Sequence, residues 1–184
     1  MENTEQLYLT TAELEAGLGA IQQSPKDEGT LAAIVVRPEV DQRIELQECE
    51  MSEAQGVHGD MWSRKGTPHL DAQVMLMNIR AITLLARTPE RRVLAGDQLY
   101  VDLDLSEDNL PAGQLLALGS AILEVTSKPH TGCSKFAQRF GQEALKFVNS
   151  PQGRQLRLRG ICTRVVQAGT AKVSDRVVKI PHSI

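Results

Sequence analysis

Short runs of branched apolar residues, separated by segments that contain glycine, proline, aspartate or serine, follow one another along most of this chain. Runs of roughly four to eight such residues between turn formers are typical of β-strands. Seven runs are predicted as strands: 31–37, 43–48, 73–77, 98–105, 121–127, 157–167 and 176–180. Seven short strands predict a mainly β fold, either a barrel or a sandwich.

Three helices are predicted beside these strands. Thr10 and Glu13 have the spacing of a capping box, which predicts a helix over 10–22. Helices are also predicted over 79–86 and 140–149, because each of these segments ends shortly before a proline.

The length and composition favour one domain. A chain of 184 residues fits a single domain, with 1–30 as an N-terminal extension that holds the first helix and 31–184 as the β domain. Aromatic residues make up only 3% of the chain, so the core is expected to consist of aliphatic side chains and methionine. The same scarcity argues against proteins that stack nucleic-acid bases on exposed aromatic rings.

The charge is unevenly distributed. The whole chain carries a net charge of -3, but segment 128–165 holds eight basic residues and one acidic residue, a net charge of +7. Attraction of the whole protein to nucleic acid is therefore not expected. The basic segment either forms a local anion site or pairs with the acidic remainder of the chain.

Neither a secretory signal nor a membrane span is visible. The first six residues are polar and acidic, and the longest apolar stretch, 74–86, is interrupted by Asn78 and Arg80. A cytoplasmic protein is expected. Its three cysteines lack paired spacing, so free thiols are predicted rather than disulfides or a structural zinc site.

Cys133 is the strongest candidate for a reactive group. Proline and glycine break the regular structure just before it, which places it on a loop or at the start of a helix. The nearby cations Lys128, His130, Lys135 and Arg139 would lower the pKa of its thiol. The alternative is a buried cysteine that packs as a small hydrophobe.

The other two cysteines are weaker candidates. Cys49 lies between Glu48 and Glu50, whose charges would raise its pKa, and Cys162 falls inside a predicted strand. His130 and Cys133 are close enough in sequence to be two metal ligands, but no second pair stands nearby to complete a zinc site.

Arg157 and Arg159 are two positions apart in the predicted strand 157–167, so both would project from one face and could hold a phosphate group. They could instead form a solvated strand face. His58, Asp60 and Asn109 lie in glycine-containing turns, where each either contacts a ligand or holds its own turn.

In order along the chain, these elements resemble the MOSC family, the domain found at the C-terminus of molybdenum cofactor sulfurases and as small stand-alone bacterial proteins. The matching elements are Arg37-Pro38, Gly56 to Asp60, Gln73-Val74, Asn109 to Gly113, His130 to Cys133, Arg139 to Gly141 and Arg159 to Ile161. The resemblance covers residues 31–180 and implies a closed, pyruvate-kinase-barrel-like β-barrel with short peripheral helices.

The resemblance also implies a function. Cys133 would carry sulfur as a persulfide or meet molybdenum, with His130 beside it, in a protein that binds the molybdenum cofactor, molybdopterin. The residues expected to hold that cofactor are Arg157, Arg159, Arg139, Lys135, Asn109, His58 and Asp60. Pyridoxal phosphate is not expected, because the aminotransferase-like domain that binds it in the sulfurases has no counterpart in this sequence.

The implied partners are a cysteine desulfurase or another sulfur donor, and a molybdoenzyme or another cofactor acceptor. Two other functions stay open: a molybdenum-dependent reductase of small N-oxygenated substrates, and an anion-binding module without catalysis.

Overall fold

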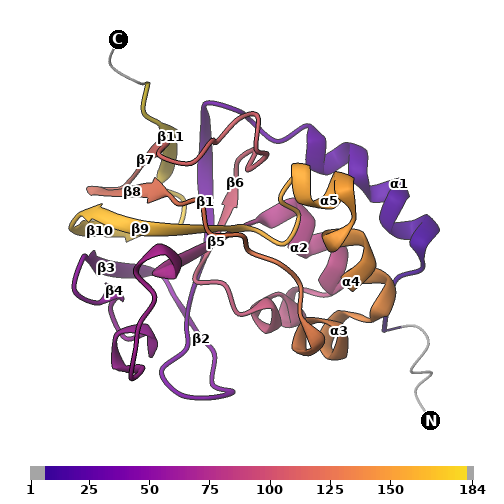
Figure 1. The fold of residues 1–184 in the computed structure, drawn as a ribbon, viewed down its shortest axis with the longest axis horizontal. Helices are drawn as coiled ribbons and strands as arrows, with labels where there is room; N and C mark the ends of the chain where they lie inside the picture. The colour runs from indigo at the N-terminus through magenta and orange to yellow at the C-terminus, as the bar shows by residue number, and fades with distance from the viewer. Residues whose placement is uncertain (1–6, 182–184) are drawn as a thin grey trace.

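Seven strands close into a ring in the computed structural model, which describes residues 7–181 (Figure 1). In order around the ring they are β11 (Arg176–Lys179), β7 (Leu115–Leu118), β8 (Ala121–Val125), β9 (Ile161–Gln167), β5 (Val74–Asn78), β6 (Leu99–Asp102) and β1 (Glu28–Val36). Strand β1 then pairs with β11, which closes the ring. Strands β5 and β6 run parallel and the other neighbours antiparallel. The predicted closed, mainly β barrel is confirmed.

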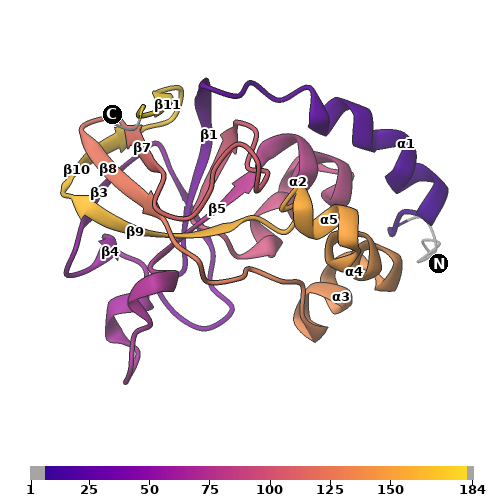
Figure 2. The same ribbon diagram turned by 45° about the horizontal axis from the view of Figure 1, so that its top comes forward.

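Four short strands extend this barrel. Strand β2 (Ile44–Leu46) pairs with the last residues of β1. A separate sheet consists of β10 (Gly169–Lys172), β3 (Glu48–Ser52) and β4 (Gly56–Val57). The tilted view of Figure 2 shows this small sheet beside the end of the barrel that lies away from the helices.

Aliphatic side chains fill the barrel. Along β8, the residues Ala121, Leu123 and Val125 are buried while Ile122 and Glu124 between them are partly exposed, the alternation that a strand imposes. The cluster they join contains leucine, isoleucine, valine, alanine, methionine and cysteine and, among the described residues, no aromatic ring. Each fully buried aliphatic side chain contributes about 1.5–3 kcal/mol relative to exposure. The predicted aliphatic core is confirmed for the barrel.

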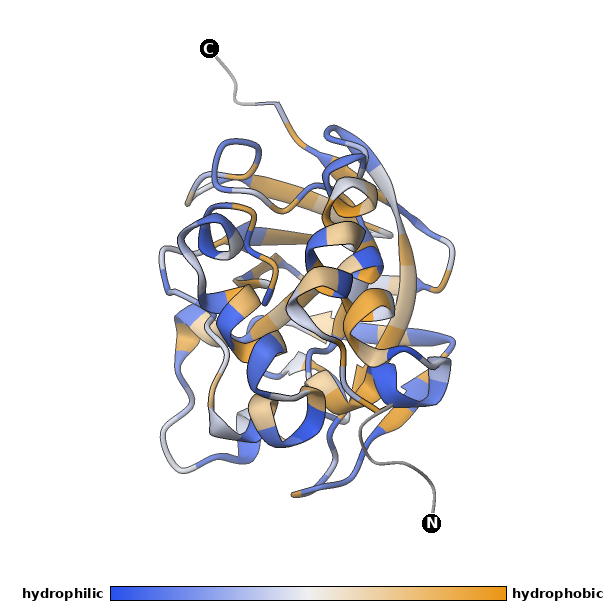
Figure 3. Cartoon of the chain, turned by 90° about the vertical axis from the view of Figure 1, so that its right-hand side faces the viewer, coloured by the Kyte–Doolittle hydropathy of each residue, from blue (hydrophilic) through white to orange (hydrophobic). Residues whose placement is uncertain are grey.

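The helices cover one side of the barrel (Figure 1). They are α1 (Thr11–Gln22), α2 (Ile79–Ala86), α3 (Ser134–Phe140), α4 (Gln142–Asn149) and α5 (Pro151–Gln155). Figure 3 looks onto this layer and shows hydrophobic and hydrophilic residues alternating along the helices. Beneath it lies a second hydrophobic cluster, which contains the buried rings of Tyr100, Phe136 and Phe140.

Three short 3-10 helices connect other elements: η2 (Trp62–Arg64), η3 (Leu70–Ala72) and η4 (Pro89–Ala95). Within the described residues, no helix is both long and apolar enough to cross a membrane.

The predicted helices exist with small changes of boundary. The capping box of α1 is present, since the Thr10 hydroxyl accepts from the Glu13 N–H and the Glu13 carboxylate accepts from the Thr10 N–H. Helix α4 begins at Gln142 rather than at 140, because Gly141, at a φ of 94°, separates it from α3. Helices α3 and α5 were not predicted, being too short to show a periodic pattern.

The predicted strands also exist, and two of them begin more than one residue away from the predicted start. Strand β1 begins at Glu28 instead of 31, and β9 begins at Ile161 instead of 157. Strands β3, β4, β7 and β10 were not predicted; each has two to five residues.

Candidate functional site

Cys133 is an exposed thiol at the start of helix α3. It is the N-cap residue, in extended backbone, as the sequence led us to expect. Its pKa lies below the ordinary value, chiefly because the backbone N–H of Phe136 stabilises the thiolate. Partial burial opposes this effect, while the N–H of Lys135 and the charges of Arg159 and Arg139 strengthen it. Cys133 therefore has the setting of a nucleophile.

The other two thiols are buried. Burial raises the pKa of Cys49 and of Cys162 to about 11. Because side chains alternate along β3, Cys49 points inward while Glu48 and Glu50 are exposed. Burial, not the flanking glutamates, keeps the Cys49 thiol protonated.

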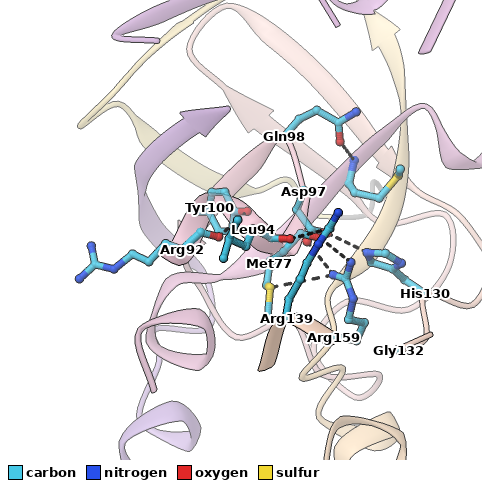
Figure 4. A network of polar contacts seen from close by, with 12 residues as sticks. Met77, Arg92, Leu94, Asp97, Gln98, Tyr100, His130, Gly132, Arg139 and Arg159 are labelled. Atoms are coloured by element: carbon cyan, nitrogen blue, oxygen red, sulfur yellow. Dashed lines mark hydrogen bonds and ion pairs between the residues drawn. The ribbon is translucent and has the colours of Figure 1, made fainter. Parts of the chain in front are cut away.

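A buried carboxylate, that of Asp97, joins His130 and Arg159 (Figure 4). Asp97 is fully buried and accepts hydrogen bonds from Nε2 of His130 at 2.7 Å and from Nη1 of Arg159 at 2.6 Å. Burial alone would raise the pKa of Asp97, but the charges of Arg159 and His130 hold it below its ordinary value. Since a carboxylate can only accept, the proton of the His130 ring lies on Nε2.

Arg159 is fixed on several sides. Its Nη2 donates to the carbonyl oxygen of Ala95 at 3.0 Å, and its guanidinium lies 5.1 Å from the centre of the Phe136 ring. Its buried Nε has no hydrogen-bond partner among the described residues. One donor of this guanidinium is thus left for a ligand or a water molecule.

A cleft of about 360 Å³ opens beside this network. We call it the cationic cleft; its charged lining residues are Arg37, Arg43, Lys65, Lys135, Arg139, Arg159, Glu39 and Asp41. His130 lines it as well. Cations outnumber carboxylates along its wall, so the cleft attracts anions.

Arg43 and Arg139 lie close together in the cationic cleft. Burial lowers the pKa of Arg43, and the charges of Arg139 and Arg37 lower it further. The Nε of Arg43 is buried and has no partner in the described part of the chain, while its Nη1 donates to a carbonyl oxygen. Nη1 of Arg139 likewise donates to the carbonyl oxygen of Leu94, 2.8 Å away. An anion bound between the guanidinium groups of Arg43 and Arg139 would offset their mutual repulsion.

The prediction that Arg157 and Arg159 share one strand face is wrong. Strand β9 begins only at Ile161, and Arg157 lies in a turn with a left-handed φ of 49°. The two side chains therefore diverge. Arg159 reaches Asp97, whereas Nη1 of Arg157 donates to the carbonyl oxygens of Leu105 and Leu110 at 3.4 and 2.5 Å.

Arg157 lines a second cleft, of about 240 Å³, which we call the Arg157 cleft. Its lining includes Glu107, Lys128, His130, Arg154, Arg157 and Gly160. His130 is the residue that lines both clefts.

Three further residues expected to hold the cofactor serve the fold. Asp60 is buried and pairs with Arg37, accepting its Nε and Nη2 at 3.0 Å each. His58 contacts Ser52 and Glu50 at the small sheet. The structure does not bring these two side chains into the lining of either cleft.

Asn109 holds its own loop. Its amide donates to the carbonyl oxygens of Lys26 and Asp104, and its side-chain oxygen accepts from Nζ of Lys179. It too lies outside the lining of both clefts. Asn109, His58 and Asp60, which were expected to hold the cofactor, each have protein partners, and none of the three lines either cleft.

Sequence reasoning missed Asp97 and Arg43. Asp97 follows Gly96 directly before a predicted strand, a position that indicates only a turn. Arg43 was included in a strand and not considered for the site.

Neither the comparison with family models nor that with curated proteins gave a match. Several solved structures do share the fold. YiiM from Escherichia coli has a TM-score of 0.57 and 19% identity, over 84% of this chain and 71% of that one. YiiM from Geobacillus stearothermophilus has a TM-score of 0.57 and 16% identity, over 85% and 77%. The YuaD protein of Bacillus subtilis has a TM-score of 0.55 and 15% identity, over 82% and 94%. At these identities the likeness shows that this chain has the same barrel fold as these three proteins.

Proposed function

We propose that this chain is a MOSC-domain protein that binds the molybdenum cofactor and carries sulfur as a persulfide on Cys133. The fold that it shares with the YiiM structures and the order of its motifs support the family. The observation that carries the proposal is the exposed, acidified thiol of Cys133, within electrostatic reach of two arginines that line the cationic cleft.

The residues of the cationic cleft fit such a cofactor. The phosphate of molybdopterin is an anion, and buried Nε atoms of Arg43 and Arg159 lack partners among the described residues. Arg43, Lys135 and Arg139 would hold the anionic end of the cofactor. Cys133 lies outside the lining of both clefts but within electrostatic reach of Arg139 and Arg159, and by the family resemblance it is the residue that would meet the metal. When bound, the cofactor would supply a molybdenum centre capable of redox and sulfur chemistry.

Sulfur loading needs only Cys133 and a donor persulfide. The Cys133 thiolate attacks the terminal sulfur of the donor, the S–S bond of the donor breaks, and its electron pair leaves on the donor thiolate. A new S–S bond then joins that sulfur to Cys133, so no outside oxidant is required. The N–H of Phe136 favours the attacking thiolate.

His130, three residues before Cys133 in the chain, would handle the proton of the loaded sulfur. Its Nε2 is held by Asp97, so Nδ1 is the ring atom left for exchange. The proposed donor is a cysteine desulfurase, and the proposed acceptor is a molybdoenzyme or the cofactor that it receives.

Mass spectrometry of the intact protein tests the loading step. After incubation with a persulfide donor, the wild type should gain about 32 mass units, the mass of one sulfur atom. Cys133→Ser should gain nothing, whereas the control Cys162→Ala should load normally because that thiol is buried. Loading of Cys133→Ser would overturn the assignment.

A titration with molybdopterin tests the cofactor. Arg43→Gln and Arg139→Gln should each weaken binding about ten-fold, since each removes a charge-assisted contact. The control Lys172→Gln, on strand β10 and outside both clefts, should bind as the wild type does. Unchanged affinity in both arginine variants would remove the cofactor from this cleft.

A further inference from the structure

We propose that the Arg157 cleft is a second anion-binding site, which takes a single small oxyanion group, a phosphate or a carboxylate. This inference is independent of the proposed function, because neither Cys133 nor a cofactor enters it. It rests on the size of the cleft, on its uncompensated cations and on the way in which Arg157 is held.

The size of the Arg157 cleft limits its occupant. Pockets for whole drug-sized ligands measure about 300–1,000 Å³. At about 240 Å³, this cleft is suited to one polar group of a ligand and not to a complete pterin. It is also distinct from the cationic cleft, with which it shares only His130 among their lining residues.

The charges of this cleft are not balanced. Lys128, Arg154 and Arg157 line it, and none of the three forms an ion pair with another described residue. Glu107 is the one acidic side chain of the lining within the described chain, and it too forms no ion pair there. Three cations facing one carboxylate leave a net positive wall.

Arg157 is positioned rather than neutralised by the protein. Its Nη1 donates to the main-chain carbonyl oxygens of Leu105 and Leu110, which fixes the guanidinium without cancelling its charge. The side chain is half-buried; burial lowers its pKa, and the charge of Glu107 raises it, the direction in which an added anion would also act. A fixed guanidinium loses little entropy when it binds an oxyanion.

The backbone is shaped around this cleft at Gly160. This residue has a φ of 112°, and a Cβ atom there would lie 2.3 Å from the carbonyl oxygen of Leu76 and 3.2 Å from Cδ2 of His130. Glycine therefore allows His130 to lie against the chain between the two clefts. The lining of the Arg157 cleft includes Lys128 to Thr131, the loop that leads to Cys133. An anion bound in this cleft would therefore lie beside that loop.

Titration of the whole protein with inorganic phosphate tests the proposal. Backbone amide NMR spectra are recorded at constant ionic strength, with sodium chloride as the balancing salt. The amides of 127–131 and 157–161 should shift and saturate together. Lys128→Gln and Arg154→Gln should each raise the Kd read from these amides about ten-fold. Arg157→Gln should do the same, and the first two variants decide the matter if it fails to fold.

Two control variants separate the possible results. Arg43→Gln changes the cationic cleft and should leave the phosphate Kd at these amides unchanged. The phosphate titration therefore reports on the Arg157 cleft, and the molybdopterin titration reports on the proposed function. Lys172→Gln changes the net charge equally but lies outside both clefts. Equal weakening by Lys172→Gln, or the absence of saturation at these amides, would overturn the site.

A parallel titration with acetate identifies the group. A lower Kd for phosphate assigns the site to phosphate groups, and a lower Kd for acetate assigns it to carboxylates. Saturation by neither anion overturns the proposal.

Discussion

Nε2 of His130 donates a hydrogen bond of 2.7 Å to Oδ1 of Asp97, although the two residues stand 33 positions apart in the chain. The same carboxylate binds Arg159, 62 positions away. One buried charge thus connects the loop before Cys133 with the entrance to strand β9 and with the turn before β6. Removing the charge of Asp97 would lower the stability of the protein and would change the hydrogen bond made by Nε2 of His130.

We expect Asp97→Asn to destabilise the protein by about 3–5 kcal/mol, because it leaves the charge of Arg159 buried without a carboxylate. Urea unfolding measures this change. The matched control is Asp27→Asn, whose carboxylate is 83% exposed and pairs with Lys179. That variant should lose no more than about 1 kcal/mol. Equal losses in the two variants would show that the buried Asp97 network stabilises the protein no more than an exposed ion pair does.

Stability should fall in acid. The pKa values of Asp97 and Asp60 are lower in the folded protein than in the unfolded chain, so their contribution is complete above the unfolded value, near pH 4. It is lost as the pH falls through the folded values. Urea unfolding at pH 6 and at pH 3 should show the loss. The difference between the two pH values should shrink in Asp60→Asn and in Asp97→Asn.

Cys133 should react with iodoacetamide faster than the other two thiols in the native protein. Labelling of Cys49 and Cys162 should require unfolding, since both are buried. Arg139→Gln should raise the pKa of Cys133 and so slow its labelling at pH 7 roughly three-fold. Peptide mapping against pH gives the rates, with Lys172→Gln as the control for net charge. Faster labelling of Cys49 or Cys162 would contradict the assignment.

Replacement of Cys133 by serine should leave the fold intact. The side chain is exposed and belongs to neither hydrophobic cluster, so the free energy of unfolding should change by less than about 0.5 kcal/mol. Thermal unfolding of Cys133→Ser checks this. A large loss would mean that Cys133 packs as a structural residue.

Gly160→Ala should destabilise the protein by about 1–3 kcal/mol. Its φ of 112° is unfavourable for alanine, and the added Cβ would meet the carbonyl oxygen of Leu76. The control is Gly19→Ala in helix α1, where a Cβ would meet nothing within 4 Å. That change should stabilise the protein by about 0.5–1 kcal/mol.

The sequence predicted the parts of the fold that depend on local pattern. The strand at 121–127, the capping box at Thr10 and the position of Cys133 on a loop or at a helix start all depend on residues within a few positions of one another. Periodicity and turn chemistry are visible at that range. The local position of Cys133 could therefore be predicted from the sequence, whereas the residues that surround it in space could not.

The surroundings of Cys133 depend on contacts between distant segments. Asp97 becomes an ion-pair partner only because the barrel brings the start of β6 to Arg159. Arg157 is not part of strand β9 because its own backbone has a left-handed φ. A rule based on alternating side chains does not predict that conformation for an arginine. Very short strands such as β4, with two residues, owe their existence to their neighbours rather than to their own sequence.

The pairing of β1 with β11 has a consequence for synthesis of the chain. The partners Glu28 and Val178 come from opposite ends of the barrel sequence, so the ring cannot close until β11 is available. Loop closure over such a distance makes folding slow. Until β11 arrives, the edges of β1 and β7 expose unpaired N–H and C=O groups, the arrangement through which incomplete chains aggregate. A nascent chain of this protein is therefore exposed to aggregation until β11 has left the ribosome and paired with β1 and β7.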